Sequence, residues 1–220
     1  WAEQTVVRDK ALTPLDDVAE LDGSPASWAL AAAFFSPTAT AFAALFDVAA
    51  LQPGERVLVT GASGAVGSMA VQFAARHGCE VVGTVGSPPN RDHVPQPATV
   101  VTSADWDDAV GDLGRFDVVV DTVGGEPLRQ AIAATNPDGR VSLVGYTAGT
   151  KITTPLNELI LADVRLLPTN LLRRDAALAP RSNVWLGELL RGELTLRHES
   201  FPLADVDAAI AALADRRRPG

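Results

Sequence analysis

Lysine is almost missing from this sequence: only Lys10 and Lys151 occur among its 220 residues, so nearly all of its positive charge is arginine. The formal net charge is -9, and an aromatic content of 5% leaves few rings on which bases could stack. Nucleic-acid binding needs clustered cations or stacking rings. We therefore expect no nucleic-acid partner.

Cysteine is equally scarce. The single Cys79 excludes an internal disulfide framework and any cysteine-rich zinc site, and it suits a reducing cytoplasm. The three histidines, His77, His93 and His198, show no ligand spacing, so we predict no metal. We interpret Cys79 as a small buried side chain and His77 as the end of a helix. The first residues lack the organisation of a signal peptide, and the predicted localisation is cytoplasmic.

Charge is absent from Gly23 to Phe46, a run long enough to test as a membrane span. Two prolines interrupt it, and the serine before each, Ser24 or Ser36, is a candidate helix cap. We predict two buried helices that break at Ser36-Pro37, and no membrane partner.

The two ends lack the organisation of a complete protein. The opening WAEQTVV is typical of a strand already under way, and the closing RRRPG places Pro-Gly where another element usually follows. We therefore expect a fragment, or a chain without a conventional first half. Residues 1–17 and 194–220 are interpreted as parts of a second, smaller domain.

Between the ends, apolar β-branched runs alternate with helical stretches. The predicted strands are residues 56–60, 80–85, 99–102, 116–123, 139–145 and 164–170, and the predicted helices are 65–77, 106–113, 127–135 and 157–162. Apolar strands separated by helices indicate a parallel sheet covered on both faces. We predict an α/β fold with a doubly wound, Rossmann-type parallel sheet, whose ligand site lies at the carboxyl ends of the strands.

One glycine-rich turn is the main candidate for a ligand-binding site. The residues VLVTGASGAVGS, numbers 57–68, place three glycines three residues apart between a strand and a helix. Glycines let the backbone approach a pyrophosphate, and the helix N-terminus supplies N–H donors. The alternative is a tight turn without a ligand, but the flanking strands and helix favour nucleotide binding. The predicted cofactor contacts are Gly61, Ser63, Gly64, Ala65, Val66 and Gly67.

The end of the second strand indicates which nucleotide binds. NAD enzymes usually place an acidic residue there for the ribose 2′-hydroxyl. The stretch GTVGSPPNR has no carboxylate before Asp92, while Ser87 and Arg91 can offer a hydroxyl and a guanidinium to a 2′-phosphate. A solvated loop arginine is the alternative interpretation of Arg91. We predict NADPH as the cofactor.

The chain resembles the zinc-free medium-chain dehydrogenase/reductase superfamily, in its quinone oxidoreductase and polyketide enoyl reductase branch. The resemblance is carried by SPTATAFAAL, LQPGERVLVTGASGAVGSMAVQFA, GTVGS, FDVVVDTVGG, GRVSLVG and FPLADVDAAIAAL. It implies a Rossmann domain at 36–170, between partial GroES-like substrate-domain segments at 1–35 and 171–220. It also implies a homodimer through the edge strand 164–170, whose open ladder is a template for pairing.

The resemblance implies further cofactor contacts. Thr40 would lie beside the nicotinamide, with capping of a turn as the alternative. The loop after the fifth strand would pack along the cofactor, although Tyr146 could equally be a half-exposed loop residue. The turn after the fourth strand would sit near the ribose and phosphates. The residues in these two segments are Asp121, Thr122, Val123, Gly124, Gly145, Tyr146 and Thr147.

The implied reaction is NADPH-dependent reduction of an activated carbon–carbon double bond in an enone, a quinone or an enoyl thioester, small or carrier-bound, as in polyketide enoyl reductases. A short-chain dehydrogenase is disfavoured, because Thr150 and not lysine stands four residues after Tyr146. A redox-inactive NADPH-binding or scaffolding module remains the alternative.

The proton donor is the least defined part of this reaction. Enoyl reductases of the resembling family carry a lysine and an aspartate at positions that correspond here to Asn90 and Asp105. Asparagine cannot deliver a proton. Asp105, Tyr146 and water are the candidates, and we favour water. The alternative role of Asp105 is an N-cap before Trp106.

Overall fold

The computed structural model describes residues 6–7, 12, 14–15 and 17–214. Most of the strand predicted in WAEQTVV lies outside these ranges, as does the closing RRRPG. Val6 and Val7 have no regular secondary structure.

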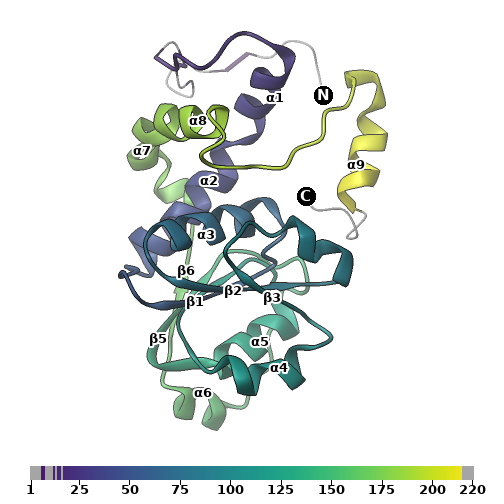
Figure 1. Ribbon diagram of the computed structural model, residues 1–220. Coiled ribbons are helices and arrows are strands. Elements are labelled where there is room, and N and C mark those ends of the chain that lie inside the picture. The colour runs from purple at the N-terminus through teal and green to yellow at the C-terminus, as the bar shows by residue number, and fades with distance from the viewer. Residues whose placement is uncertain (1–5, 8–11, 13, 16, 215–220) are drawn as a thin grey trace.

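Strands and helices alternate along the described chain (Figure 1). The strands are β1 (Arg56–Thr60), β2 (Glu80–Val85), β3 (Thr99–Thr102), β4 (Phe116–Asp121), β5 (Thr135–Leu143) and β6 (Arg165–Pro168). The α-helices are α1 (Pro25–Ala33), α2 (Phe35–Phe42), α3 (Ala65–Arg76), α4 (Trp106–Leu113), α5 (Gly125–Ala133), α6 (Leu156–Ala162), α7 (Asp175–Leu178), α8 (Ser182–Leu190) and α9 (Val206–Ala214). A π-helical segment, η2 (Ala43–Val48), continues α2, and the 3-10 turns are η3 (Pro88–His93), η4 (Leu171–Arg173), η5 (Ala179–Arg181) and η6 (Leu203–Asp205).

The six strands form one sheet in the order β3-β2-β1-β4-β5-β6, and every neighbouring pair is parallel. The chain winds outward from β1 in one direction and from β4 in the other. This is the doubly wound topology, with a crevice expected at the carboxyl ends of β1 and β4. The predicted fold class is confirmed.

The sheet separates two hydrophobic cores. Val57 and Val59 are fully buried on the face covered by α2 and α3, while Leu58 is fully buried on the opposite face. Alternation along β1 sends successive side chains to opposite faces, so a continuous apolar strand serves both cores. Figure 1 shows α2 and α3 on one side of the sheet and α4, α5 and α6 on the other.

The segment after β6 returns to the first of these cores. Trp185 and Leu186 of α8, and Leu194 beyond it, are buried in the same cluster as β1. Gln72 of α3 fastens the segment: its side-chain amide donates to the Thr195 carbonyl oxygen, and its Oε1 accepts from the Thr195 N–H, both at 2.8 Å. In Figure 1, α9 stands to the side of this body. The division of the chain at residue 170 stays a prediction.

The uncharged run forms the bent helix pair α1 and α2. Ser24 caps α1 as predicted, accepting from the Ser27 N–H at 3.2 Å. Ser36 is not a cap, because α2 already begins after Phe34 and Pro37 falls in its first turn, where proline loses no hydrogen bond. In the described ranges, no single helix has the length and apolar content to cross a membrane. The pair α1 and α2–η2 meets that test together but is bent by 42°.

Candidate functional site

The turn from β1 to α3 is built without side chains on its inner surface. Gly61 has a φ of +65°, and a Cβ on Gly67 would lie 2.2 Å from the Gly61 carbonyl oxygen. The first turn of α3 therefore packs directly on the turn. Gly64 is the N-cap residue and has no side chain that could cover the first N–H groups. Backbone donors at a helix N-terminus suit an anionic group.

The structure brings the predicted residues of this turn together. Ser63, Ala65 and Val66 are half-buried around the glycines, at the carboxyl edge of the sheet. Their contact with a cofactor stays a prediction.

The turn after β4 is hydrogen-bonded to the end of β1. The Thr60 hydroxyl donates to Asp121 Oδ1 at 2.6 Å and accepts from the Thr122 N–H at 3.1 Å. The Thr122 hydroxyl in turn donates to the Thr60 carbonyl oxygen at 2.7 Å. Thr60, which sequence reasoning missed, thus joins the two turns. The sequence feature that could have identified Thr60 is its position directly before Gly61.

Asp121 faces inward and is completely buried. Its Oδ2 accepts from the Gly124 N–H at 2.9 Å. Burial raises the pKa of Asp121, while hydrogen bonds from Thr60 and from the Gly124 and Val123 amides act in the opposite direction. The carboxylate therefore holds the turn in shape. Thr122 and Val123, both half-buried, lie closer to the surface of the same turn.

The loop after β5 forms a third part of this edge. The Gly145 N–H donates to the Asp121 carbonyl oxygen at 3.2 Å, and a Cβ on Gly145 would lie 2.0 Å from the Thr122 carbonyl oxygen. Tyr146 is 70% exposed, and Thr147 is also exposed. The loop backbone, not the tyrosine ring, packs on the turn after β4.

Thr40 lies on α2, between the fully buried Ala39 and Ala41, and is itself half-buried. α2 packs against α3, and the Ser142 hydroxyl of β5 donates to the Ala44 carbonyl oxygen of η2 at 2.7 Å. Thr40 is therefore carried by a helix anchored to the sheet. Its position beside a nicotinamide stays a prediction.

The loops after β2 and β3 meet in an ion pair. Arg91 donates through Nη2 to Asp105 Oδ2 at 2.9 Å and through Nη1 to the Val100 carbonyl oxygen at 3.3 Å. Thr102 donates its hydroxyl to the same Asp105 oxygen at 2.5 Å. Asp105 is the N-cap residue of α4, but its side chain makes no capping hydrogen bond. The predicted 2′-phosphate contact, Arg91, and one of the candidate proton donors, Asp105, thus form one ion pair.

Two further residues of the loop after β2 carry predicted roles. Ser87 is the half-buried N-cap residue of η3. Asn90, at the position of the family's lysine, is only 5% exposed, and its Oδ1 is buried without a hydrogen-bond partner.

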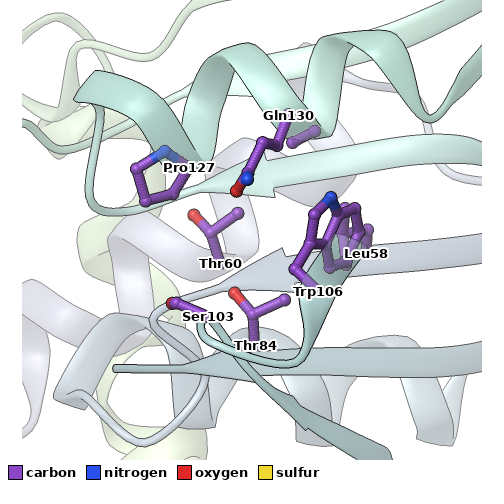
Figure 2. A pocket seen from close by; sticks show the side chains of 8 residues that line it. Leu58, Thr60, Thr84, Ser103, Trp106, Pro127 and Gln130 are labelled. Atoms are coloured by element: carbon purple, nitrogen blue, oxygen red, sulfur yellow. The ribbon is translucent and has the colours of Figure 1, made fainter. Parts of the chain in front are cut away.

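A shallow pocket opens at the same edge, on the α4–α5 face (Figure 2). Figure 2 shows that strand residues, the segment after β3 and α5 all contribute to its wall. The lining residues are Leu58, Thr60, Thr84, Ser103, Trp106, Pro127, Gln130 and Ala131. Sequence reasoning missed Thr84 and Ser103, although both stand at the carboxyl ends of predicted strands.

No group of three or more His, Cys, Asp or Glu side chains in the described ranges is arranged to hold a metal ion. Cys79 is buried, its thiol contacts the Gln52 carbonyl oxygen at 3.4 Å, and burial raises its pKa. His77 is the C-cap residue of α3, as predicted.

A doubly wound parallel sheet with a glycine cradle between β1 and α3 defines a dinucleotide-binding type of protein. The family model described as "Zinc-binding dehydrogenase" matches residues 65–179, more than half of the chain, and the chain belongs to this family. Within it, the similarities lie with the quinone oxidoreductase-like and enoyl reductase members of the medium-chain dehydrogenase/reductases.

Several relatives are 29–35% identical to this chain over the residues that align. Prostaglandin reductase-3 of Mus musculus is 29% identical over 63% of the chain and 38% of its own length. Prostaglandin reductase 1 of Bos taurus is 34% identical over 55% of the chain and 39% of its length. A highly reducing polyketide synthase of Didymella fabae is 35% identical over 48% of the chain and 6% of its length. The chain spans about two fifths of the two reductases.

Among solved structures, the quinone oxidoreductase of Thermus thermophilus, which was also solved in complex with NADPH, superposes with a TM-score of 0.71. It is 30% identical, and the match covers 86% of this chain and 63% of that one.

Proposed function

We propose that this chain forms the NADPH-binding part of an oxidoreductase that reduces activated carbon–carbon double bonds. The observation that carries the proposal is the side-chain-free cradle at Gly61 and Gly67, in a chain that belongs to a dehydrogenase family. The names of its relatives support an enone, a quinone or an enoyl thioester as the substrate, the last as in polyketide enoyl reductases.

The residues of this chain fit the cofactor. No side chain caps the first N–H groups of α3, which suits the pyrophosphate, and Ser87 and Arg91 follow β2, where the 2′-phosphate is expected. Bound NADPH would supply the hydride. The protein's own part is to bind and orient the cofactor, through a turn that Thr60 and Asp121 hold in place.

We assign no side chain as the proton donor. Tyr146 is 70% exposed, and the Asp105 carboxylate is engaged by Arg91 and Thr102. Water can protonate an enolate-stabilised carbanion without a dedicated acid, so it remains the proposed source.

The substrate side of the site is proposed to come from the flanking segments, 1–35 and 171–220, as parts of a GroES-like domain. The match covers 63% of the Thermus thermophilus enzyme.

The experiment that tests this function has two steps. Calorimetric titration with NADPH measures binding, and loss of NADPH absorbance with a panel of enones, quinones and enoyl thioesters measures turnover. Binding together with oxidation supports a reductase. Binding without oxidation across the panel favours the redox-inactive module, and no binding refutes both proposals.

We also propose a homodimer that pairs at the edge strand. β6 lies at the edge of the sheet, as predicted, and the adjacent α6 exposes Leu156, Ile160 and Leu161 by 66–79%. An open ladder beside exposed apolar side chains favours isologous pairing. Leu161→Asp should convert dimer to monomer in light scattering at micromolar concentration, while the exposed Leu172→Asp, on η4, should not. A monomeric mass for the unchanged chain would refute the dimer.

A further inference from the structure

We propose that Asp105 is a specificity-determining residue that opposes the 2′-phosphate at Arg91 and so narrows the preference for NADPH over NADH. This inference rests on the proposed function. It concerns only the ribose end of the nucleotide, away from the glycine cradle. The carrying observation is the ion pair between Arg91 and Asp105, which joins the loops after β2 and β3.

The fold places Asp105, which follows β3, beside Arg91 in the loop after β2, where the sequence has no acidic residue before Asp92. β2 and β3 pair in parallel with Val85 opposite Thr102, and the Ser103 N–H donates to the Val85 carbonyl oxygen at 2.8 Å. The two loops therefore leave the sheet side by side. A tight turn, in which the Asp105 N–H donates to the Thr102 carbonyl oxygen at 3.1 Å, then returns the Asp105 carboxylate to Arg91.

The carboxylate is held by two hydrogen bonds to the same oxygen. Asp105 Oδ2 accepts from Arg91 Nη2 at 2.9 Å and from the Thr102 hydroxyl at 2.5 Å. An acidic residue near the end of the second strand is what NAD enzymes use to bind the ribose 2′-hydroxyl, whereas an arginine accommodates the 2′-phosphate of NADP. In this chain the arginine that follows β2, Arg91, is in contact with an aspartate that follows β3, Asp105.

The negative charge of Asp105 works against a phosphate dianion that binds Arg91. Arg91 is the single arginine or lysine in residues 87–93 and 103–108, and Asp105 is the acidic side chain paired with it. A 2′-phosphate that reaches Arg91 must share the guanidinium with Asp105 and come close to its negative charge. The ribose 2′-hydroxyl of NADH meets no such repulsion and can donate to a carboxylate.

The test compares the dissociation constants of NADPH and NADH for the unchanged chain and for Asp105→Asn. Both side chains of the pair are about half exposed, at 42% for Arg91 and 58% for Asp105, so solvent screens the effect. We expect Asp105→Asn to tighten NADPH binding about three- to tenfold and to leave NADH unchanged or slightly weaker. The gain should shrink as salt is raised from about 0.05 to 0.5 M, because the repulsion is electrostatic.

The matched control is Asp108→Asn, which removes the same charge from an exposed position in the first turn of the same helix. It should change NADPH affinity less than about twofold, since exposed charges at greater distance are screened. In an Arg91→Ala background, Asp105→Asn should lose part of its effect, because the shared guanidinium is gone.

Two outcomes overturn the inference while leaving the proposed function intact. In the first, NADPH binds, but Asp105→Asn and Asp108→Asn change its affinity equally. In the second, Asp105→Asn weakens NADPH, which would show that the carboxylate orients Arg91 toward the phosphate. If neither nucleotide binds the unchanged chain, the proposed function itself fails, and the inference fails with it.

Discussion

The carboxyl edge of the sheet consists of two unlike halves. At the ends of β1 and β4, Thr60 and Asp121 are almost wholly buried and hydrogen-bonded to each other and to the turns they support. At the ends of β2 and β3, Arg91 and Asp105 are about half exposed and joined by an ion pair in contact with solvent.

The difference separates two tasks. A buried hydrogen bond is expensive to break, because the partner left behind loses its solvation, so the β1–β4 half holds one shape. An exposed ion pair contributes little to stability and is screened by salt, so the β2–β3 half can change without disturbing the fold. We therefore expect the first half to determine whether a nucleotide binds and the second to determine which one.

Gly67→Val should give the largest effect. A Cβ at this position would lie 2.2 Å from the Gly61 carbonyl oxygen, so the turn must move away from α3. We expect NADPH affinity to fall at least about a hundredfold, or about 2.7 kcal/mol, in calorimetry. Gly111→Ala, where a Cβ meets nothing within 4 Å, is the control. Unchanged affinity in a folded Gly67→Val chain would contradict the cradle.

Thr60→Val should destabilise the buried half by about 2–3 kcal/mol, because Asp121 and the Thr122 N–H both lose a partner. The measurement is the free energy of unfolding in urea. Thr84→Val provides a matched control, since Thr84 is also buried and stands opposite Thr60 in the β1–β2 register. Equal losses for the two variants would show that the Thr60 network contributes nothing beyond packing.

The sequence predicted the sheet well for a physical reason. Buried parallel strands are continuous apolar runs, and the predicted limits of β2 and β3 match the structure. Boundaries without such a run were less accurate. β4 ends at Asp121, and β5 begins at Thr135, where it pairs with Phe116 ahead of a register shift.

The site was predicted less completely, because sequence order does not show which loops meet. The absence of an acid after β2 favoured NADPH, yet Asp105 returns to that place from β3. Asp121 was predicted to lie near the ribose and phosphates, and its complete burial gives its carboxylate the task of holding the turn. The pairing of β2 with β3 decides the first outcome, and burial at the end of β4 decides the second.

Arg91→Ala should change only the selectivity between NADPH and NADH. We expect NADPH to bind about fivefold more weakly, or about 1 kcal/mol, since the lost contact is charged but exposed. NADH affinity should remain the same, because its ribose carries no 2′-phosphate. Calorimetric titrations with both nucleotides make the comparison, and equal losses for the two would remove Arg91 from the 2′-phosphate site.

Asp105→Asn should have the smallest effect on the chemical step. The carboxylate is directed to Arg91 and Thr102, and a proton delivered from it would break both hydrogen bonds. With saturating NADPH and a substrate that is turned over, we expect the rate of hydride transfer to stay within about tenfold of the unchanged chain, or about 1.4 kcal/mol of barrier. Saturation separates this rate from any change in cofactor affinity. A loss beyond about a thousandfold, with the fold and NADPH binding intact, would identify Asp105 as the acid and move it from selectivity to catalysis.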